Sequence, residues 1–202
     1  MYFTTLTTLL TLAASALAAP APAPTYHNWP GAPTKTYTAP RITHTVVAGR
    51  GGQLRFDPEN VVAEVGSIVE FHFLPANHSV VEAAFNAPCR PRSDVDPAAP
   101  NSFFSGFFPV TPNPDGSLRQ SEEVFQIEVK DDKPIWYYCG QPGGGGHCQR
   151  GMVGVINQRF DTPFTLEKFR QEAAKVPPPP GLPAGGVRGG WRIPNPNPLG
   201  GF

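Results

Sequence analysis

The chain is poor in charge and in sulfur. Only 16% of its 202 residues are charged, and it has three cysteines and two methionines. Its 16 basic and 16 acidic residues cancel, and no run of like charge stands out, so the electrostatic footprint of a nucleic-acid or acidic-membrane binder is missing. There is no GxxxxGK phosphate loop and no GxSxG nucleophile turn. We therefore expect no nucleic-acid partner and neither of those two catalytic classes.

Long apolar runs are missing after the first eighteen residues, MYFTTLTTLLTLAASALA. This stretch has no charged side chain and ends in small residues, which predicts a secretory signal peptide over 1–18. A short N-terminal anchor is the alternative, but the run is below the ~20 residues of a spanning helix. The final residues, PNPNPLGGF, lack the hydrophobic tail of a lipid-anchor signal. We expect a secreted, extracellular or cell-wall-associated protein with no membrane span.

Proline is concentrated towards the two ends of the chain. Of 26 prolines, six lie in 19–40 and nine in 161–202. This composition predicts a Pro-rich leader at 19–41 and a Pro/Gly-rich disordered tail at 177–202. One domain of ordinary size is then expected over 42–160.

The body consists of short β-branched and aromatic segments separated by Gly and Asp-Pro, which predicts an all-β Greek-key sandwich or barrel. The clearest strand signals lie at 43–49, 67–73, 124–129, 134–139 and 151–157.

A short helix is predicted over 161–176, where it would lie on the sandwich. Thr162 can cap it and Pro163 suits its first position. Leu166, Phe169 and Ala173 form its apolar stripe.

Alternation in 67–73 places His72 on the same side as Glu70, so we expect His72 to be a solvated strand residue.

The three cysteines of a secreted chain leave one thiol without a partner. His147 and Cys148 are neighbours, and in an extended segment their side chains point to opposite sides. This favours Cys139 on the side of His147, with Cys148 free to bridge to Cys89. A Cys139–Cys148 bridge with a free Cys89 is the alternative.

A set of metal-binding residue types is clustered in IWYYCGQPGGGGHCQRGMVGVI. Cys139, His147 and Met152 lie within fourteen positions, and His78 stands upstream in PANHSV. One thiolate, two imidazoles and one thioether suit copper, whereas zinc and iron–sulfur centres would use more sulfur. Taken singly, His78 would be a surface histidine and Met152 a core methionine. His44, at the edge of the first strand, does not fit the set.

At these residues the chain resembles the cupredoxins, among them the phytocyanin-like and fungal secreted plastocyanin-like proteins. The resemblance covers about 43–158, and its signature is HSV at His78, Tyr138-Cys139, His147-Cys148 and Met152. It implies a cupredoxin-like Greek-key β-sandwich and one copper ion held by His78, Cys139, His147 and an axial Met152. It also implies a disulfide matching Cys89–Cys148.

Two features depart from the usual pattern. The loop GQPGGGG between Cys139 and His147 is longer than in the plant proteins, and Asn77 begins a glycosylation sequon beside a proposed ligand. We expect the sequon to be unused or the copper edge to be covered.

A further aromatic group, Phe103, Phe104, Phe107 and Phe108, lies in the irregular segment 90–124. We favour a role in closing the core over one in surrounding the metal.

The resemblance implies a monomeric one-electron carrier that is not an enzyme, since no general base or carboxylate pair is evident. Its partner would be an unknown extracellular redox protein or a cell-wall component. The alternatives are extracellular copper sequestration or delivery, and a wall-associated structural module whose site has lapsed.

Overall fold

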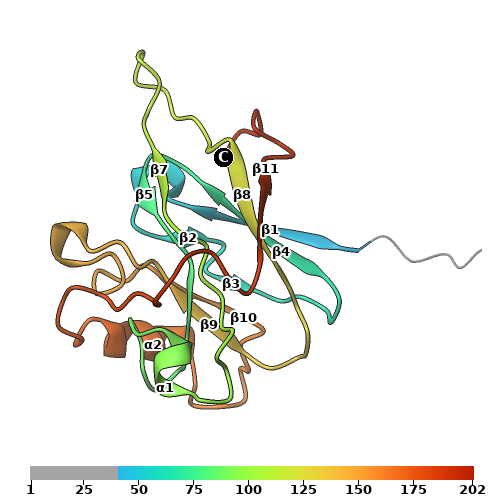
Figure 1. The fold of residues 1–202 in the computed structure, drawn as a ribbon, viewed down its shortest axis with the longest axis vertical. Coiled ribbons are helices and arrows are strands. Elements are labelled where there is room, and N and C mark those ends of the chain that lie inside the picture. The colour runs from blue at the N-terminus through green and yellow to red at the C-terminus, as the bar shows by residue number, and fades with distance from the viewer. Residues whose placement is uncertain (1–40) are drawn as a thin grey trace, which may run out of the picture. The chain divides into compact units, whose positions relative to one another are not determined.

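The computed structural model describes residues 41–202, which form β-sheets with a helix on one face (Figure 1). The predicted signal peptide and most of the predicted leader lie outside the described residues. The strands are β1 (Thr43–Ala48), β2 (Phe56–Asp57), β3 (Asn60–Val61), β4 (Ile68–Phe73), β5 (Ala76–His78), β6 (Val81–Ala83), β7 (Phe108–Val110), β8 (Glu123–Glu128), β9 (Ile135–Tyr138), β10 (Val153–Ile156) and β11 (Trp191–Pro194). The helices are α1 (Arg92–Val95) and α2 (Leu166–Ala173), with 3-10 turns η1 (Arg50–Gly52) and η2 (Gly143–Gly145).

Two sheets form the sandwich. The larger has the strand order β11-β8-β4-β1-β2, and the second has the order β3-β10-β9-β6. A two-stranded ribbon, β5-β7, accompanies them. β1 runs parallel to β4 and β3 runs parallel to β10, while the other pairs are antiparallel. The prediction of an all-β sandwich with one short C-terminal helix is confirmed, with the four-residue α1 as an addition.

The alternation along β9 separates two hydrophobic cores. Tyr137 and Cys139 belong to the core between the two sheets, whereas Trp136 and Tyr138 belong to a second core on the other face of the smaller sheet. Successive side chains of a strand point to opposite faces, so a continuously apolar strand can serve both cores. Cys139 therefore points between the sheets.

Helix α2 covers the second core. Its buried side chains are Phe169 and Ala173, as the predicted stripe requires. The predicted cap was wrong: Thr165, not Thr162, accepts the hydrogen bond from the Lys168 backbone N–H and begins the helix. Thr162 instead closes a turn before the helix. Both threonines carry a hydroxyl that can cap a helix, so residue type alone does not choose between them. The helix that buries Phe169 begins after Thr165.

The C-terminal tail differs from the disordered segment that its composition predicts. Trp191–Pro194 forms the edge strand β11, which pairs antiparallel with β8. Gly189 and Gly190 precede it, and a Cβ atom on either would collide with the backbone of Phe103 or Gln126. The glycines that suggested disorder thus permit close backbone contact.

His72 is buried, which corrects the prediction of a solvated residue. It is only 1% exposed. Its Nε2 lies 2.7 Å from Glu70 Oε1 and its Nδ1 lies 2.8 Å from Gln120 Oε1. The Gln120 amide donates in turn to the backbone carbonyls of Asn197 and Gly200. The tail therefore covers this polar face of β4.

The aromatic group closes the cores, as favoured. Phe103 and Phe108 belong to the core between the sheets, and Phe104 belongs to the second core. Phe108 also lies in β7, opposite His78 of β5. A segment rich in turn residues therefore supplies the strand that holds a candidate ligand in register.

Candidate metal centre

Three side chains far apart in the sequence meet at one end of the sandwich. His78 ends β5, Cys139 directly follows β9, and His147 lies in the loop before β10. Their ligand atoms all lie within 4.8 Å of one another. Cys139 Sγ is 3.5 Å from His147 Nδ1 and 3.8 Å from His78 Nδ1. All three residues are buried.

Backbone hydrogen bonds hold the loop that carries His147. The Cys139 N–H donates to the Met152 carbonyl, and the Met152 N–H donates to the His147 carbonyl. The His147 N–H donates to Gln141, which closes the loop on itself. Between these bonds, η2 has Gly144 in the left-handed region at φ 64°. The glycine run is therefore an ordered turn rather than a flexible insertion.

Met152 is fully buried between the sheets. Its backbone forms hydrogen bonds with the backbones of Cys139 and His147. These bonds hold Met152, which directly precedes β10, beside both residues. Its role as the axial ligand stays a prediction.

Ser79 braces the thiol and was not identified from the sequence. Its backbone N–H lies 3.5 Å from Cys139 Sγ, and its hydroxyl accepts a hydrogen bond from the Gly140 N–H at 2.9 Å. The only available signal was its position directly after His78.

Gly49 was also missed. A Cβ atom at this position would lie 2.6 Å from His78 Nε2, so the turn after β1 lies directly against the imidazole. Its φ of 86° is also one that side chains rarely adopt. The signal was the glycine-rich GRGG turn, which did not reveal its neighbour.

Burial sets the protonation of the three groups in the metal-free protein. Burial, with the charge of His147 as a smaller cause, lowers the pKa of His78 to about 4. Burial and then the Arg150 guanidinium lower the pKa of His147. Burial raises the pKa of the Cys139 thiol to about 11. Near neutral pH the cluster therefore presents two neutral imidazoles and one thiol.

This donor set fits one copper ion. Nitrogen and sulfur ligands bonded at roughly 2.0–2.3 Å to one ion stand about 3.7 Å apart when the angle between them is near 120°. The two separations from Sγ, 3.5 and 3.8 Å, agree with that value. Neutral imidazoles can ligate at once, and a coordinating thiol loses its proton to the metal. A soft sulfur with two borderline nitrogens is the set that favours copper.

A disulfide joins Cys89 and Cys148, as predicted, and the alternative Cys139–Cys148 bridge is wrong. Cys148 lies in the second core while its neighbour His147 lies at the metal cluster. The bridge ties the ligand loop to a segment 59 residues away. In the chain-entropy account a loop of that length is stabilised by about 4 kcal/mol.

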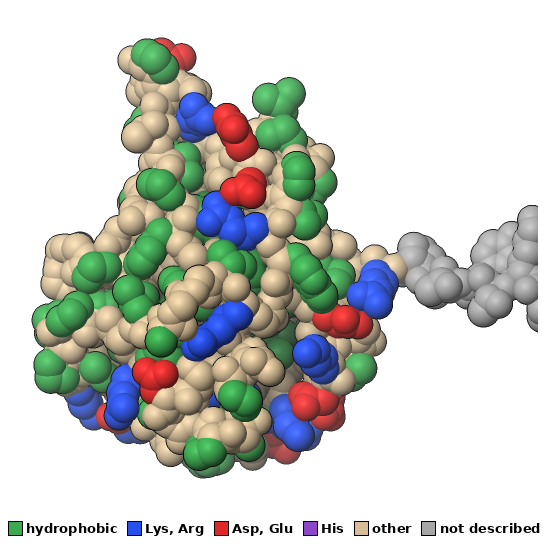
Figure 2. All heavy atoms as spheres, viewed as in Figure 1, with side chains coloured by type: hydrophobic (Ala, Val, Ile, Leu, Met, Phe, Trp, Pro, Cys, Tyr) green, Lys and Arg blue, Asp and Glu red, His purple; other side chains and the backbone are tan. Residues whose placement is uncertain are grey.

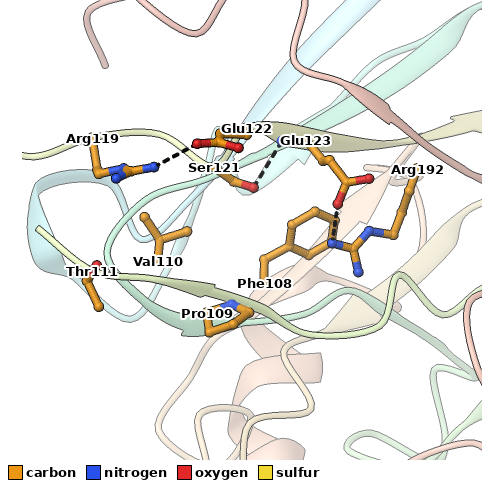
Figure 3. Close-up of a pocket in the computed structure, with 9 residues that line it drawn as sticks. All are labelled: Phe108, Pro109, Val110, Thr111, Arg119, Ser121, Glu122, Glu123 and Arg192. Carbon is orange, nitrogen blue, oxygen red and sulfur yellow. Dashed lines mark hydrogen bonds and ion pairs between the residues drawn. The ribbon is translucent and has the colours of Figure 1, made fainter.

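A separate hollow of about 330 Å³ lies between β7, β8 and β11 and contains none of the proposed ligands (Figure 3). Its charges are paired: Arg119 with Glu122, and Arg192 with Glu123. Arg192 also lies over the Phe108 ring, 3.9 Å from its centre. Arg192 thus holds β7 against β8. The charged side chains of the hollow pair with one another, so none of them is left for a ligand.

Comparison with known proteins agrees with this centre. No protein-family model matches the chain. It is 34% identical to "Probable GPI-anchored cupredoxin-1" of Arthroderma benhamiae over 136 residues, 67% of this chain and 61% of that protein. It is 32% identical to an "Extracellular serine-rich protein" of the same fungus over 151 residues, 73% of this chain and 52% of that protein. The chain thus spans between half and two thirds of these relatives.

Among solved structures, native pseudoazurin from Hyphomicrobium denitrificans is 17% identical, with a TM-score of 0.35, over 67% of this chain and 98% of that chain. A sandwich with two buried imidazoles facing a thiol defines a metal-binding β protein. Together with the named relative, it makes the chain a cupredoxin-like protein. Within 41–202, no helix has the length and apolarity to cross a membrane.

Proposed function

We propose that the protein is a secreted electron carrier with one copper ion held by His78, Cys139, His147 and Met152. The observation that carries the proposal is the convergence of one buried thiol and two buried imidazoles within 4.8 Å. When bound, copper would supply a one-electron couple. No substrate turnover is part of the proposal.

The protein's own contribution is geometric and electrostatic. The sheets and the loop bonds fix the donors, so little rearrangement would accompany each electron. Burial keeps the imidazoles neutral and excludes water from the thiol. The backbone N–H of Ser79 points to the sulfur, where it would stabilise negative charge.

Three observations support secretion. The first eighteen residues have the pattern of a signal peptide. The Cys89–Cys148 disulfide belongs to an oxidising compartment. One relative is named extracellular and the other GPI-anchored. The redox partner is proposed to be extracellular, and the carrier to act as a monomer.

Copper titration of the purified protein tests the proposal. One equivalent of Cu(II) should produce the intense visible absorption of a thiolate–copper bond, and Cys139→Ser should abolish it. The matched control is His44→Gln, which removes a histidine on β1 outside the cluster and should leave the absorption intact. Absence of the band from the parent protein would exclude a blue-copper site and favour a structural module.

Reduction distinguishes electron transfer from copper delivery. The copper-loaded protein should be bleached by an external reductant and should recover its colour on reoxidation, with the metal retained after dialysis. Release of copper on reduction would favour delivery instead.

A further inference from the structure

Arg150 lies on the ligand loop without an ion-pair partner. It is exposed, and it follows His147 by three residues. A Cβ atom on Gly144 would lie 3.1 Å from its Nη1, so the guanidinium is held against η2. Nearby Arg170 pairs with Glu59 and Glu167, but among residues 41–202 nothing pairs with Arg150. Arg150 is therefore the unpaired charge of the ligand loop itself, beside an Arg170 group in which one cation meets two carboxylates.

The segments around the donor atoms contain no carboxylate. These segments are 49–53, 74–80 and 140–152, and their only formally charged residues are Arg50 and Arg150. Arg50 shares Asp57 with Arg55, so two cations and one anion leave one positive charge in that group. Arg150 and the Arg50 group each contribute one positive charge, and the Arg170 group has one excess carboxylate, so the metal end keeps one positive charge although the whole chain has a formal net charge of zero.

The tail residues that lie against the ligand loop are uncharged. Pro180 lies against Gly146 and Leu182 against Gly140, and the tail segment 177–187 has no charged residue. On the face in view in Figure 2, the flank that carries η2 shows hydrophobic and uncharged atoms without acidic ones. Arg150 is therefore the charge that a partner would meet on the ligand loop itself.

We propose that Arg150 selects an anionic redox partner, namely an acidic protein surface that meets the ligand loop. The inference rests on the proposed electron-transfer function. Complementary charge accelerates encounter more than it strengthens binding, so the effect belongs to the association rate.

Two small reductants of opposite charge provide the test. Each transfers one electron to the Cu(II) protein: hexacyanoferrate(II) becomes hexacyanoferrate(III), and hexaammineruthenium(II) becomes hexaammineruthenium(III). At an ionic strength of 0.1 M, Arg150→Gln should slow reduction by the anion roughly fivefold and accelerate reduction by the cation. Arg150→Glu should enlarge both changes.

Lys133→Gln is the matched control, because it removes the same charge from the far end of β9. Lys133 lies in the bend before β9, and the strand places its Ile135 end about 13 Å from Cys139 at roughly 3.3 Å per residue, which exceeds the Debye length of about 10 Å at 0.1 M salt. Its rates at that ionic strength should equal those of the parent.

The outcomes separate this inference from the function on which it rests. Opposite shifts for the two reductants support charge selection. Shifts in the same direction would reflect a changed reduction potential and would overturn it, as would unchanged rates. In those two cases the absorption band and reversible reduction would persist, so the electron-transfer function would stand. Loss of the band from the parent protein would instead remove the function itself.

Discussion

Two buried clusters contain histidine, and they differ in what faces the imidazole rings. His72 lies between Glu70 and Gln120, with an oxygen acceptor within 2.8 Å of each ring nitrogen. His78 and His147 instead turn Nδ1 towards one thiol, and no side-chain oxygen lies at hydrogen-bond distance from either in the described residues. A histidine held between two oxygen acceptors stabilises a fold, whereas nitrogens that converge on one thiol are available to a metal. The partners of a buried histidine therefore indicate its role better than its burial does.

The largest expected effect is on the satisfied cluster. His72→Ala should lower the free energy of unfolding by about 3–5 kcal/mol, because Glu70 would keep its buried position without the imidazole. Denaturant unfolding measures the loss. The double variant Glu70→Leu/His72→Leu should recover part of it, since the buried carboxylate is removed, while the Gln126 amide loses Glu70 as its acceptor. A cost below about 1 kcal/mol for the single variant would show that the cluster is not a coupled pair.

Acid should weaken the metal-free protein through the other cluster. The pKa of His78 is about 4 in the fold, against an ordinary value near 6.5. As pH falls below about 6.5, the unfolded chain binds a proton that the folded chain does not, so stability decreases by up to about 1.4 kcal/mol per pH unit. The loss should total about 3 kcal/mol by pH 4.

Thermal unfolding of the metal-free parent and of His78→Leu, compared between pH 7.5 and pH 4, isolates this contribution. The variant should lack the His78 share of the acid loss. Identical pH profiles would contradict the lowered pKa.

The convergence of His78, Cys139 and His147 could be predicted from the sequence and the burial of His72 could not, for a physical reason. Cys139 and His147 are close in the chain, and their residue types are rare enough to define a site. Alternation also identified the face of β4 that carries His72, but it cannot show whether another segment covers that face. The cover is the Gly/Pro-rich tail, whose pairing with β8 depends on close backbone packing rather than on any apolar pattern. For the same reason, the sequence does not reveal that the turn at Gly49 lies against His78.

A smaller effect is expected at Gly49. Gly49→Ala should lower copper affinity about tenfold, because the new methyl group would push His78 from its position. Gly51→Ala is the control: it also has a positive φ, of 63°, but nothing lies within 4 Å of the added atom. Both variants carry the backbone cost of about 1–2 kcal/mol. Competition with a copper chelator measures affinity, and equal losses in both variants would exclude contact with His78 as the cause.

The smallest effect is expected when a candidate ligand is removed without metal. His78→Leu should change the stability of the metal-free protein by less than about 1 kcal/mol near neutral pH, because a neutral imidazole is replaced by an apolar group of similar size. Added copper should then no longer raise the melting temperature as it does for the parent. Calorimetry with and without one equivalent of copper tests both statements. A large loss without copper would make His78 a structural residue like His72.

The distribution of the three cysteines has a consequence for how the protein matures. The thiol of Cys139 points between the sheets, whereas Cys89 and Cys148 meet on the opposite face of the smaller sheet. Once β9 and β10 have paired, that sheet is a partition: an oxidant can close the bridge on one side without reaching the thiol on the other. Strand pairing therefore separates the sulfur atoms, and the Cys139 thiol is protected from mispairing with Cys89 or Cys148.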